Sequence, residues 1–224
     1  WVDNLKTYSD GFIEWYKARI EAQGFTQEYG IDYEETFAPA AHLTLVHSLL
    51  AVAAARHWSV FLMDVKNAFL NGDLIEEVYI QPPHGSSVPS NKVCKLRRVL
   101  YGLKQSSCSR FAKFNSTIRD FDFSSSAHDS TLLIRKTECG TIFVLLYVND
   151  MIITRDDIMG ISSLQQFLHR QFKMKDLDFL IYFLGSEISQ DSSSYFLTQA
   201  KYTSDLMAHV GLTDCKPTPI LVDP

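Results

Sequence analysis

The most constraining feature of this sequence is a pair of polar residues, Asn149 and Asp150, set between two apolar runs at residues 141–148 and 151–154. Both runs are rich in Ile, Val, Leu and Tyr, which is typical of buried β-strands. The polar pair is therefore expected in the turn of a β-hairpin. Asn and Asp both tolerate the positive φ of tight turns, so this pair alone also fits an ordinary hairpin.

A further carboxylate, Asp64, lies inside another apolar run at residues 60–70. An ionised carboxylate is costly to bury unless a metal ion, a cation or several hydrogen bonds accompany it. Two strands that each bring an acidic residue to one place are what a two-metal centre for phosphoryl transfer requires. The sequence therefore predicts an acidic site beside the hairpin turn.

Several long segments in a fixed order resemble the reverse transcriptase domain of Ty1/copia-type retrotransposons, from about residue 16 to residue 219. The hallmark Tyr-Val-Asp-Asp string of that family reads Tyr147-Val148-Asn149-Asp150 here. The other matching segments are Tyr16-Lys17-Ala18-Arg19, Gly24-Phe25-Thr26-Gln27, residues 30–39, residues 63–70, Leu100-Tyr101-Gly102-Leu103-Lys104-Gln105 and Tyr182-Phe183-Leu184-Gly185.

The resemblance implies an α+β fold: a polymerase palm, built as an antiparallel sheet with helices packed on one face, together with a fingers subdomain and a largely absent thumb. Within a reverse transcriptase domain at residues 1–215, the expected fingers are residues 1–57 and 73–104. The expected palm is residues 58–72 and 105–198, and residues 199–224 begin the thumb or connection.

The resemblance also implies the chemistry. A primer hydroxyl attacks a nucleotide at its α-phosphorus with the help of two Mg²⁺ ions, for which Mn²⁺ can substitute. Asp64, the residue at position 149 and Asp150 are the expected catalytic and metal-binding residues, with the carbonyl of Val65 as an extra ligand. The implied partners are an RNA or DNA template with its primer and deoxynucleoside triphosphates.

Further roles follow from the same resemblance. Lys17, Arg19, Phe69, Tyr101 and Gly102 match positions that contact the incoming nucleotide, and Phe69 would exclude a ribose 2′ hydroxyl. From spacing alone, Lys17 and Arg19 fit a solvated edge strand better than a phosphate-binding pair, and Phe69 fits a core position equally well. The hairpin of Phe183, Leu184 and Gly185 is expected to hold the primer end.

This chain departs from the family pattern at the site itself, because Asn149 stands where the family has Asp. An amide offers a divalent ion a neutral, weaker oxygen, so metal binding is weakened. A loss of about 4 kcal/mol of transition-state stabilisation slows a reaction roughly a thousandfold. Other departures are Ser107, Cys108 and Arg110 in place of Pro, Arg and Trp, Arg155 in place of Gly just after the hairpin, and His42 and His47 in place of basic residues.

Composition fits one globular domain, since 46% of the 224 residues are hydrophobic. The apolar runs are too short to cross a membrane, and the N-terminus lacks a leader pattern, so we expect no membrane association and an intracellular protein, cytoplasmic in a virus-like particle or nuclear. The four cysteines are scattered along the sequence, which argues against a zinc knuckle. The net charge of −5 argues against tight nucleic-acid binding. The oligomeric state is left open.

Apolar spacing also predicts local structure. Helices are expected at residues 44–57, capped by Thr44, and at residues 104–121, 158–172 and 201–210. Strands are expected at residues 78–81, 93–98, 180–189 and 195–198, and a hairpin around Ser9-Asp10-Gly11, with a further turn at Asn71-Gly72.

Two alternatives to an active polymerase remain. The first is a catalytically dead retrotransposon-derived protein that keeps the palm fold and at most binds nucleic acid or a partner. The second is a metal nuclease built on Asp64, Asp150 and Glu187.

Overall fold

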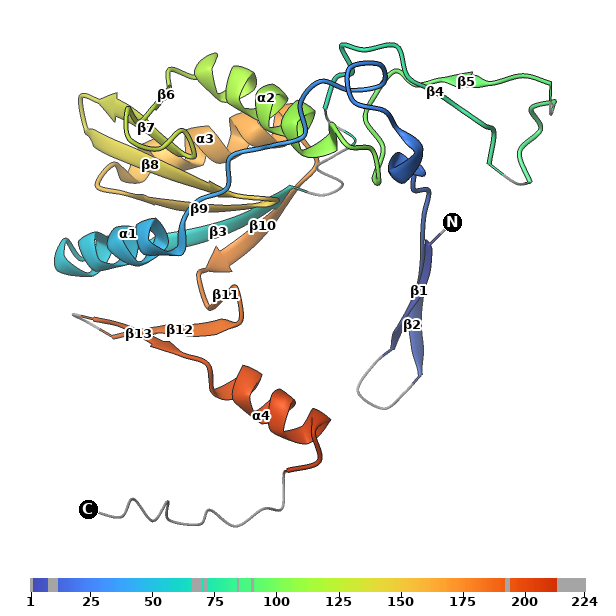
Figure 1. Ribbon diagram of the computed structural model, residues 1–224. Coiled ribbons are helices and arrows are strands. Elements are labelled where there is room, and N and C mark those ends of the chain that lie inside the picture. Colours follow the sequence, from blue (N-terminus) through green and yellow to red (C-terminus); the bar gives the residue numbers. More distant parts are fainter. Residues whose placement is uncertain are drawn as a thin grey trace, which may run out of the picture.

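The computed structural model describes residues 2–7, 12–65, 70, 72–83, 85–89, 91–191 and 194–212. Its centre is a six-stranded antiparallel sheet in the order β10-β3-β9-β8-β7-β6 (Figure 1). The strands are β3 (Val60–Val65), β6 (Ser124–Ser125), β7 (Leu132–Thr137), β8 (Gly140–Tyr147), β9 (Asp150–Arg155) and β10 (Met174–Phe179).

Two helices, α2 (Ser106–Arg119) and α3 (Ile158–Gln171), cover one face of this sheet. Their apolar stripes pack on alternate residues of β3, β7, β8 and β9, as the periodicity of a half-buried strand requires. Fully buried members of this core include Met63, Ile118, Leu133, Ile142, Val144, Ile153, Leu164 and Leu168.

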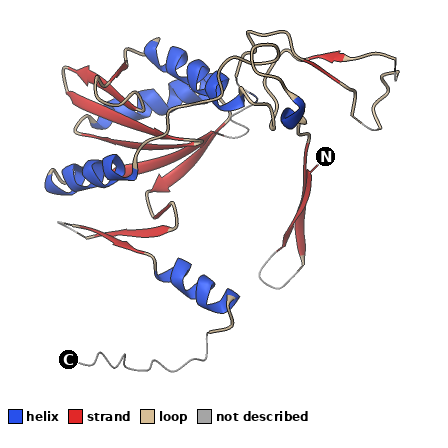
Figure 2. Cartoon of the chain, viewed as in Figure 1, coloured by secondary structure: helices blue, strands red, loops and turns tan. Residues whose placement is uncertain are grey.

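The opposite face of the sheet is covered as well, by α1 (Leu43–Ala55) and a three-stranded sheet of β11 (Tyr182–Phe183), β12 (Ser186–Gln190) and β13 (Tyr195–Thr198). Figure 2 shows the helices on both sides of the strands. The expectation of helices on one face was therefore only partly right. Because β8 and β9 are apolar on both faces, both faces need cover from water.

Smaller elements project from this centre (Figure 1). The first is an antiparallel pair of β1 (Val2–Thr7) and β2 (Ile13–Arg19), followed by the short helix η1 (Gly24–Thr26). A second pair joins β4 (Tyr79–Ile80) to β5 (Cys94–Lys95), where Lys95 pairs with Glu77. The last helix, α4 (Ala200–His209), buries none of its residues.

The four expected helices and the hairpin at residues 141–154 are confirmed, with ends that shift by at most two residues. The strand expected at residues 180–189 is instead two short strands, β11 and β12, joined by a turn. Thr44 is not the helix cap: His42 precedes the helix, and the Thr44 carbonyl accepts a bond from the Ser48 hydroxyl inside it. The expected turn at residues 9–11 lies outside the described residues, as does Asn71 of the other one. Among the described residues, no helix is long and apolar enough to cross a bilayer.

Candidate active site at the hairpin turn

The structure pairs Asp64 of β3 directly with Asp150 of β9. The Val65 amide donates to the Asn149 carbonyl at 3.1 Å, so the two aspartates occupy a non-hydrogen-bonded position of the ladder. At such positions paired Cα atoms are about 4.5 Å apart and the side chains are closest. The two carboxylates expected at this site are therefore cross-strand neighbours, each half-buried.

The turn itself falls one residue earlier than expected. Tyr147 pairs with Asp150, so the two turn residues are Val148 and Asn149, and Asp150 begins β9. Val148 has a φ of +49°, which is unusual for a β-branched residue and strained. Such strain tends to occur where the surrounding structure holds a functional loop in place.

The charge of Asp64 acts on the carboxyl group of Asp150. Burial and, secondarily, the nearby charge of Asp64 raise the pKa of Asp150. A divalent cation between the side chains would remove both penalties, so this pair fits one such ion with hard oxygen ligands. A third acidic, His or Cys ligand is missing: no group of three such side chains exists in the part of the chain that the structure describes. Glu187, in β12, thus forms no such group with them.

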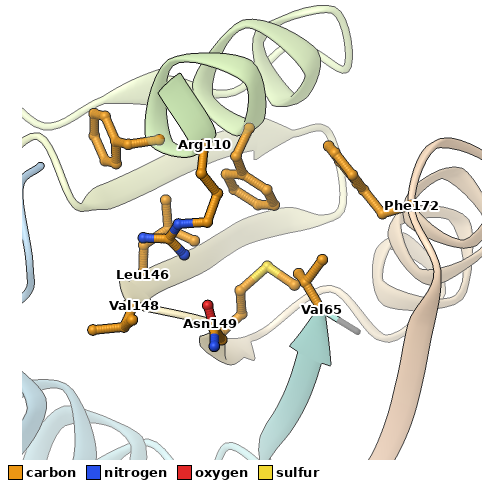
Figure 3. Close-up of a pocket in the computed structure, with 9 residues that line it drawn as sticks. Val65, Arg110, Leu146, Val148, Asn149 and Phe172 are labelled. Atoms are coloured by element: carbon orange, nitrogen blue, oxygen red, sulfur yellow. The ribbon is translucent and has the colours of Figure 1, made fainter. Parts of the chain in front are cut away.

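Asn149 faces the other side of the sheet from this pair. Its side chain lines a pocket beneath α2 and α3, together with Val65, Arg110, Phe111, Phe114, Leu146, Val148, Met151 and Phe172 (Figure 3). Its Oδ1 atom is buried without a hydrogen-bond partner. In the same pocket, burial lowers the pKa of the Arg110 guanidinium.

Two of the segments that carry the resemblance lie against each other. The Ala22 amide donates to the Tyr101 carbonyl at 2.7 Å, and the Gln27 side chain accepts from the Lys104 amide and donates to Gln105. A Cβ on Gly102, which has a φ of +88°, would overlap the Ala22 carbonyl oxygen. The glycine is therefore required by the packing of the chain on itself.

The remaining nucleotide-contacting candidates are spread over several elements. Lys17 and Arg19 both lie in β2, opposite Asn4 and Val2. Phe69 lies outside the described residues.

The expected primer hairpin forms between β11 and β12. Leu184 and Gly185 have φ values of +51° and +80°, as in the tight turns that fit twisted strands. Phe183 is buried and meets the ring of Tyr147 edge-on at 5.6 Å. Leu184, in contrast, is exposed. This contact ties the hairpin to the strand that ends at the metal-site candidate.

Arg155 does not lie near the hairpin turn, contrary to its position in the sequence. It ends β9, five residues from Asp150, and an extended strand covers about 16 Å over that span. Its guanidinium lies 5.6 Å from the Phe61 ring centre and donates to the Asp157 carbonyl. The substitution at 155 therefore leaves the turn itself unobstructed.

Sequence reasoning missed one charged neighbour of the acidic pair. Lys175 of β10 is directly opposite Asp64, so one row across the sheet reads Lys175, Asp64, Asp150, Tyr147. No signal pointed to it, because β10 itself was not expected. Arg110 was recognised only as a departure from the family pattern.

Comparison with known proteins identifies the family of this chain. A profile described as "Reverse transcriptase (RNA-dependent DNA polymerase)" matches residues 1–223. Similar proteins include the "Retrovirus-related Pol polyprotein from transposon RE1" of Arabidopsis thaliana, 36% identical over all of this chain and 16% of its own length. Another is the "Retrovirus-related Pol polyprotein from transposon TNT 1-94" of Nicotiana tabacum, which is 37% identical over 97% of this chain and 17% of its own length.

The chain thus belongs to the reverse transcriptase family, in the group found in copia-type retrotransposon Pol polyproteins. It spans about a sixth of the length of these relatives.

Proposed function

We propose that this chain is the RNA-directed DNA polymerase domain of a copia-type retrotransposon polyprotein, with catalysis impaired by Asn149. The observation that carries the proposal is the cross-strand pair of Asp64 and Asp150 beside a strained hairpin turn. Family membership supports it, because reverse transcriptases act on a nucleic-acid template and nucleotides with divalent metal ions.

In this proposal Asp64 and Asp150 hold a divalent cation, Mg²⁺ or Mn²⁺, through their carboxylate oxygens. When bound, two such ions activate the primer hydroxyl and neutralise charge on the leaving pyrophosphate. A second ion would have the Val65 carbonyl and the neutral amide of Asn149, whose oxygen lies on the opposite side of the sheet. The chain therefore offers one well-charged cation site rather than two.

The same proposal gives roles to the surrounding elements. Residues 1–57 and 73–104 act as fingers, residues 58–72 and 105–198 as palm, and residues 199–224 begin the thumb or connection. Nucleotide contacts come from Lys17, Arg19, Phe69, Tyr101 and Gly102, and the turn of Phe183, Leu184 and Gly185 supports the primer end. The substrates are deoxynucleoside triphosphates and an RNA or DNA template with its primer.

One observation favours a second candidate, a catalytically dead protein that keeps the fold and at most binds nucleic acid. The Asn149 oxygen lies in the pocket under α2, on the opposite side of the sheet from the paired aspartates. With that oxygen turned away, Asp64 and Asp150 are left without a third ligand from a described acidic, His or Cys side chain.

Primer extension with Mg²⁺ or Mn²⁺ distinguishes the two candidates. We expect extension by the unmodified chain to be about a thousandfold below that of an intact site, and Asn149→Asp to raise it at least about tenfold. Asp64→Asn, in the Asn149→Asp background, should remove the gain because it deletes half of the carboxylate pair. Extension that is unaffected by Asp64→Asn would rule out this site. If neither Asp nor Glu at position 149 increases primer extension, the catalytically dead protein is the better candidate.

A further inference from the structure

A half-buried arginine lies beneath the candidate site. Arg110 reaches from α2 into the pocket under the hairpin turn, where its neighbours are mainly apolar side chains (Figure 3). In Figure 3 the Asn149 side-chain oxygen lies on the Arg110 side of that pocket. The guanidinium and the side chain at position 149 therefore share one poorly solvated space.

The present Asn149 fits this space poorly, because its Oδ1 atom is buried there without a hydrogen-bond donor. A carboxylate at the same position would behave differently. A guanidinium presents several donors in a planar fork that matches a carboxylate, and their attraction is stronger in a poorly solvated pocket than in water.

Charges on the other face of the sheet would also push a carboxylate at position 149 toward Arg110. Asp64 and Asp150 are paired there as cross-strand neighbours. A third negative side chain would be repelled from that pair until a cation is bound, and attracted to Arg110 on the opposite side.

We propose that Arg110 is a positioning residue for the side chain at position 149: it draws a carboxylate placed there into the pocket under α2, away from the paired aspartates. This inference rests on the proposed function, since it concerns the same site. It means that Asn149→Asp alone repairs the site only partly and that the charge of Arg110 is a second, independent obstacle.

A double-mutant cycle on thermal stability tests the pairing without any catalysis. Asn149→Asp is made in the unmodified chain, in Arg110→Lys, which keeps the charge, and in Arg110→Met, which keeps an unbranched side chain but removes the charge. We expect the change in Tm caused by Asn149→Asp to be at least about 4 °C more favourable in the unmodified chain than in the Arg110→Met background. The Arg110→Lys background should retain part of this difference.

The matched control is Arg155→Met. Arg155 is also a partly buried arginine, against Phe61, but it lies at the far end of β9. Its removal should leave the effect of Asn149→Asp on Tm unchanged, because it shares no pocket with residue 149. Equal coupling of residue 149 to Arg110 and Arg155 would overturn the inference, since it would reflect net charge alone.

A Mn²⁺ titration followed by Tm or calorimetry tests the consequence for metal binding. The double variant Asn149→Asp with Arg110→Met should bind Mn²⁺ on the order of tenfold more tightly than Asn149→Asp alone. Primer extension should rise in the same order. Equal Mn²⁺ affinity in the two variants would overturn the inference.

The two proposals fail in distinguishable ways. If coupling to Arg110 and tighter Mn²⁺ binding are both found but no variant extends a primer, the positioning role stands and the proposed polymerase function fails. If Asn149→Asp alone extends primers as fast as the double variant and shows no coupling to Arg110, the function stands and the positioning role fails.

Discussion

Two glycines allow the loops at residues 21–27 and 100–105 to cross in direct contact. A Cβ on Gly24 would overlap the Gly102 carbonyl oxygen, and a Cβ on Gly102 would overlap that of Ala22. Both obstacles are backbone atoms, which move only if a loop moves. At the residue scale, the motifs that identify the family thus also hold the fold together.

Gly102→Ala should lower the free energy of unfolding by about 2–3 kcal/mol, because it adds a backbone clash to an unfavourable positive φ. Urea unfolding measures the change. Gly30→Ala is the matched control: Gly30 has a φ of +79° but nothing within 4 Å of an added Cβ, so its loss should be about 1 kcal/mol. Equal losses at the two positions would show that the crossing imposes no constraint.

Asp157 precedes α3 and accepts a bond from the Gly160 amide at 2.9 Å and one from the Thr137 hydroxyl. Both hydrogen bonds lower the pKa of the Asp157 carboxyl, and the bond from Gly160 has the larger effect. The stability this carboxylate contributes is therefore present above its unfolded pKa, near 3.9, and is lost as the pH falls through the lower folded value.

Asp157→Asn should accordingly lower Tm at pH 7 and have a shrinking effect as the pH falls below about 4. Thermal unfolding between pH 7 and pH 3 gives the comparison. A difference in Tm that stays constant over this range would mean that the charge of Asp157 contributes nothing to the cap.

At the scale of elements, the β8–β9 hairpin is the best example of what a sequence can and cannot predict. Its two apolar runs are long and continuous, and both strands appear where expected. The turn lies one residue early because Asp150 pairs with Asp64 on one side and Tyr147 on the other. That pairing is non-local, so the turn residues alone do not contain it.

In other elements, too, local spacing was predictable from the sequence and non-local pairing was not. The apolar stripes of α2 and α3 have helical spacing and predicted both helices. In β7 and β10, by contrast, charged residues such as Arg135, Lys136 and Lys175 interrupt the apolar alternation. These strands form because β8 and β3 offer unpaired backbone groups beside them. The acidic pair was predicted from its residues, whereas the orientation of Asn149 toward Arg110 depends on packing under α2.

The strain in this hairpin leads to a prediction. Val148→Asn should raise the free energy of unfolding by about 1 kcal/mol, because Asn adopts a positive φ more readily than a β-branched residue. Val93→Asn, at another exposed valine in a loop, is the control and should change stability by less than about 0.5 kcal/mol. Chemical denaturation measures both, and destabilisation by Val148→Asn would mean that the valine side chain is needed in the pocket.

At the scale of the whole molecule, the net charge of −5 opposes tight binding of nucleic acid, because that binding depends largely on Lys and Arg contacts to phosphates. We expect this chain alone to bind a primer–template with a Kd near or above about 100 μM at physiological salt, and with a shallow dependence on salt. Fluorescence anisotropy at several salt concentrations measures both. Tight binding with a steep salt dependence would show that a strong basic surface exists after all.

The covering of the second sheet face sets how far the chain can be shortened. Leu180, Phe183 and Ile188 bury Leu145 and Ile152 together with α1, and the Tyr195 hydroxyl donates to the Trp58 carbonyl at 3.0 Å. Among the described elements, truncation after β13 would remove α4, none of whose residues is buried. Truncation before Leu180 would uncover part of this sheet face, including Leu145 and Ile152, so we expect a folded fragment to need the chain up to about Thr198.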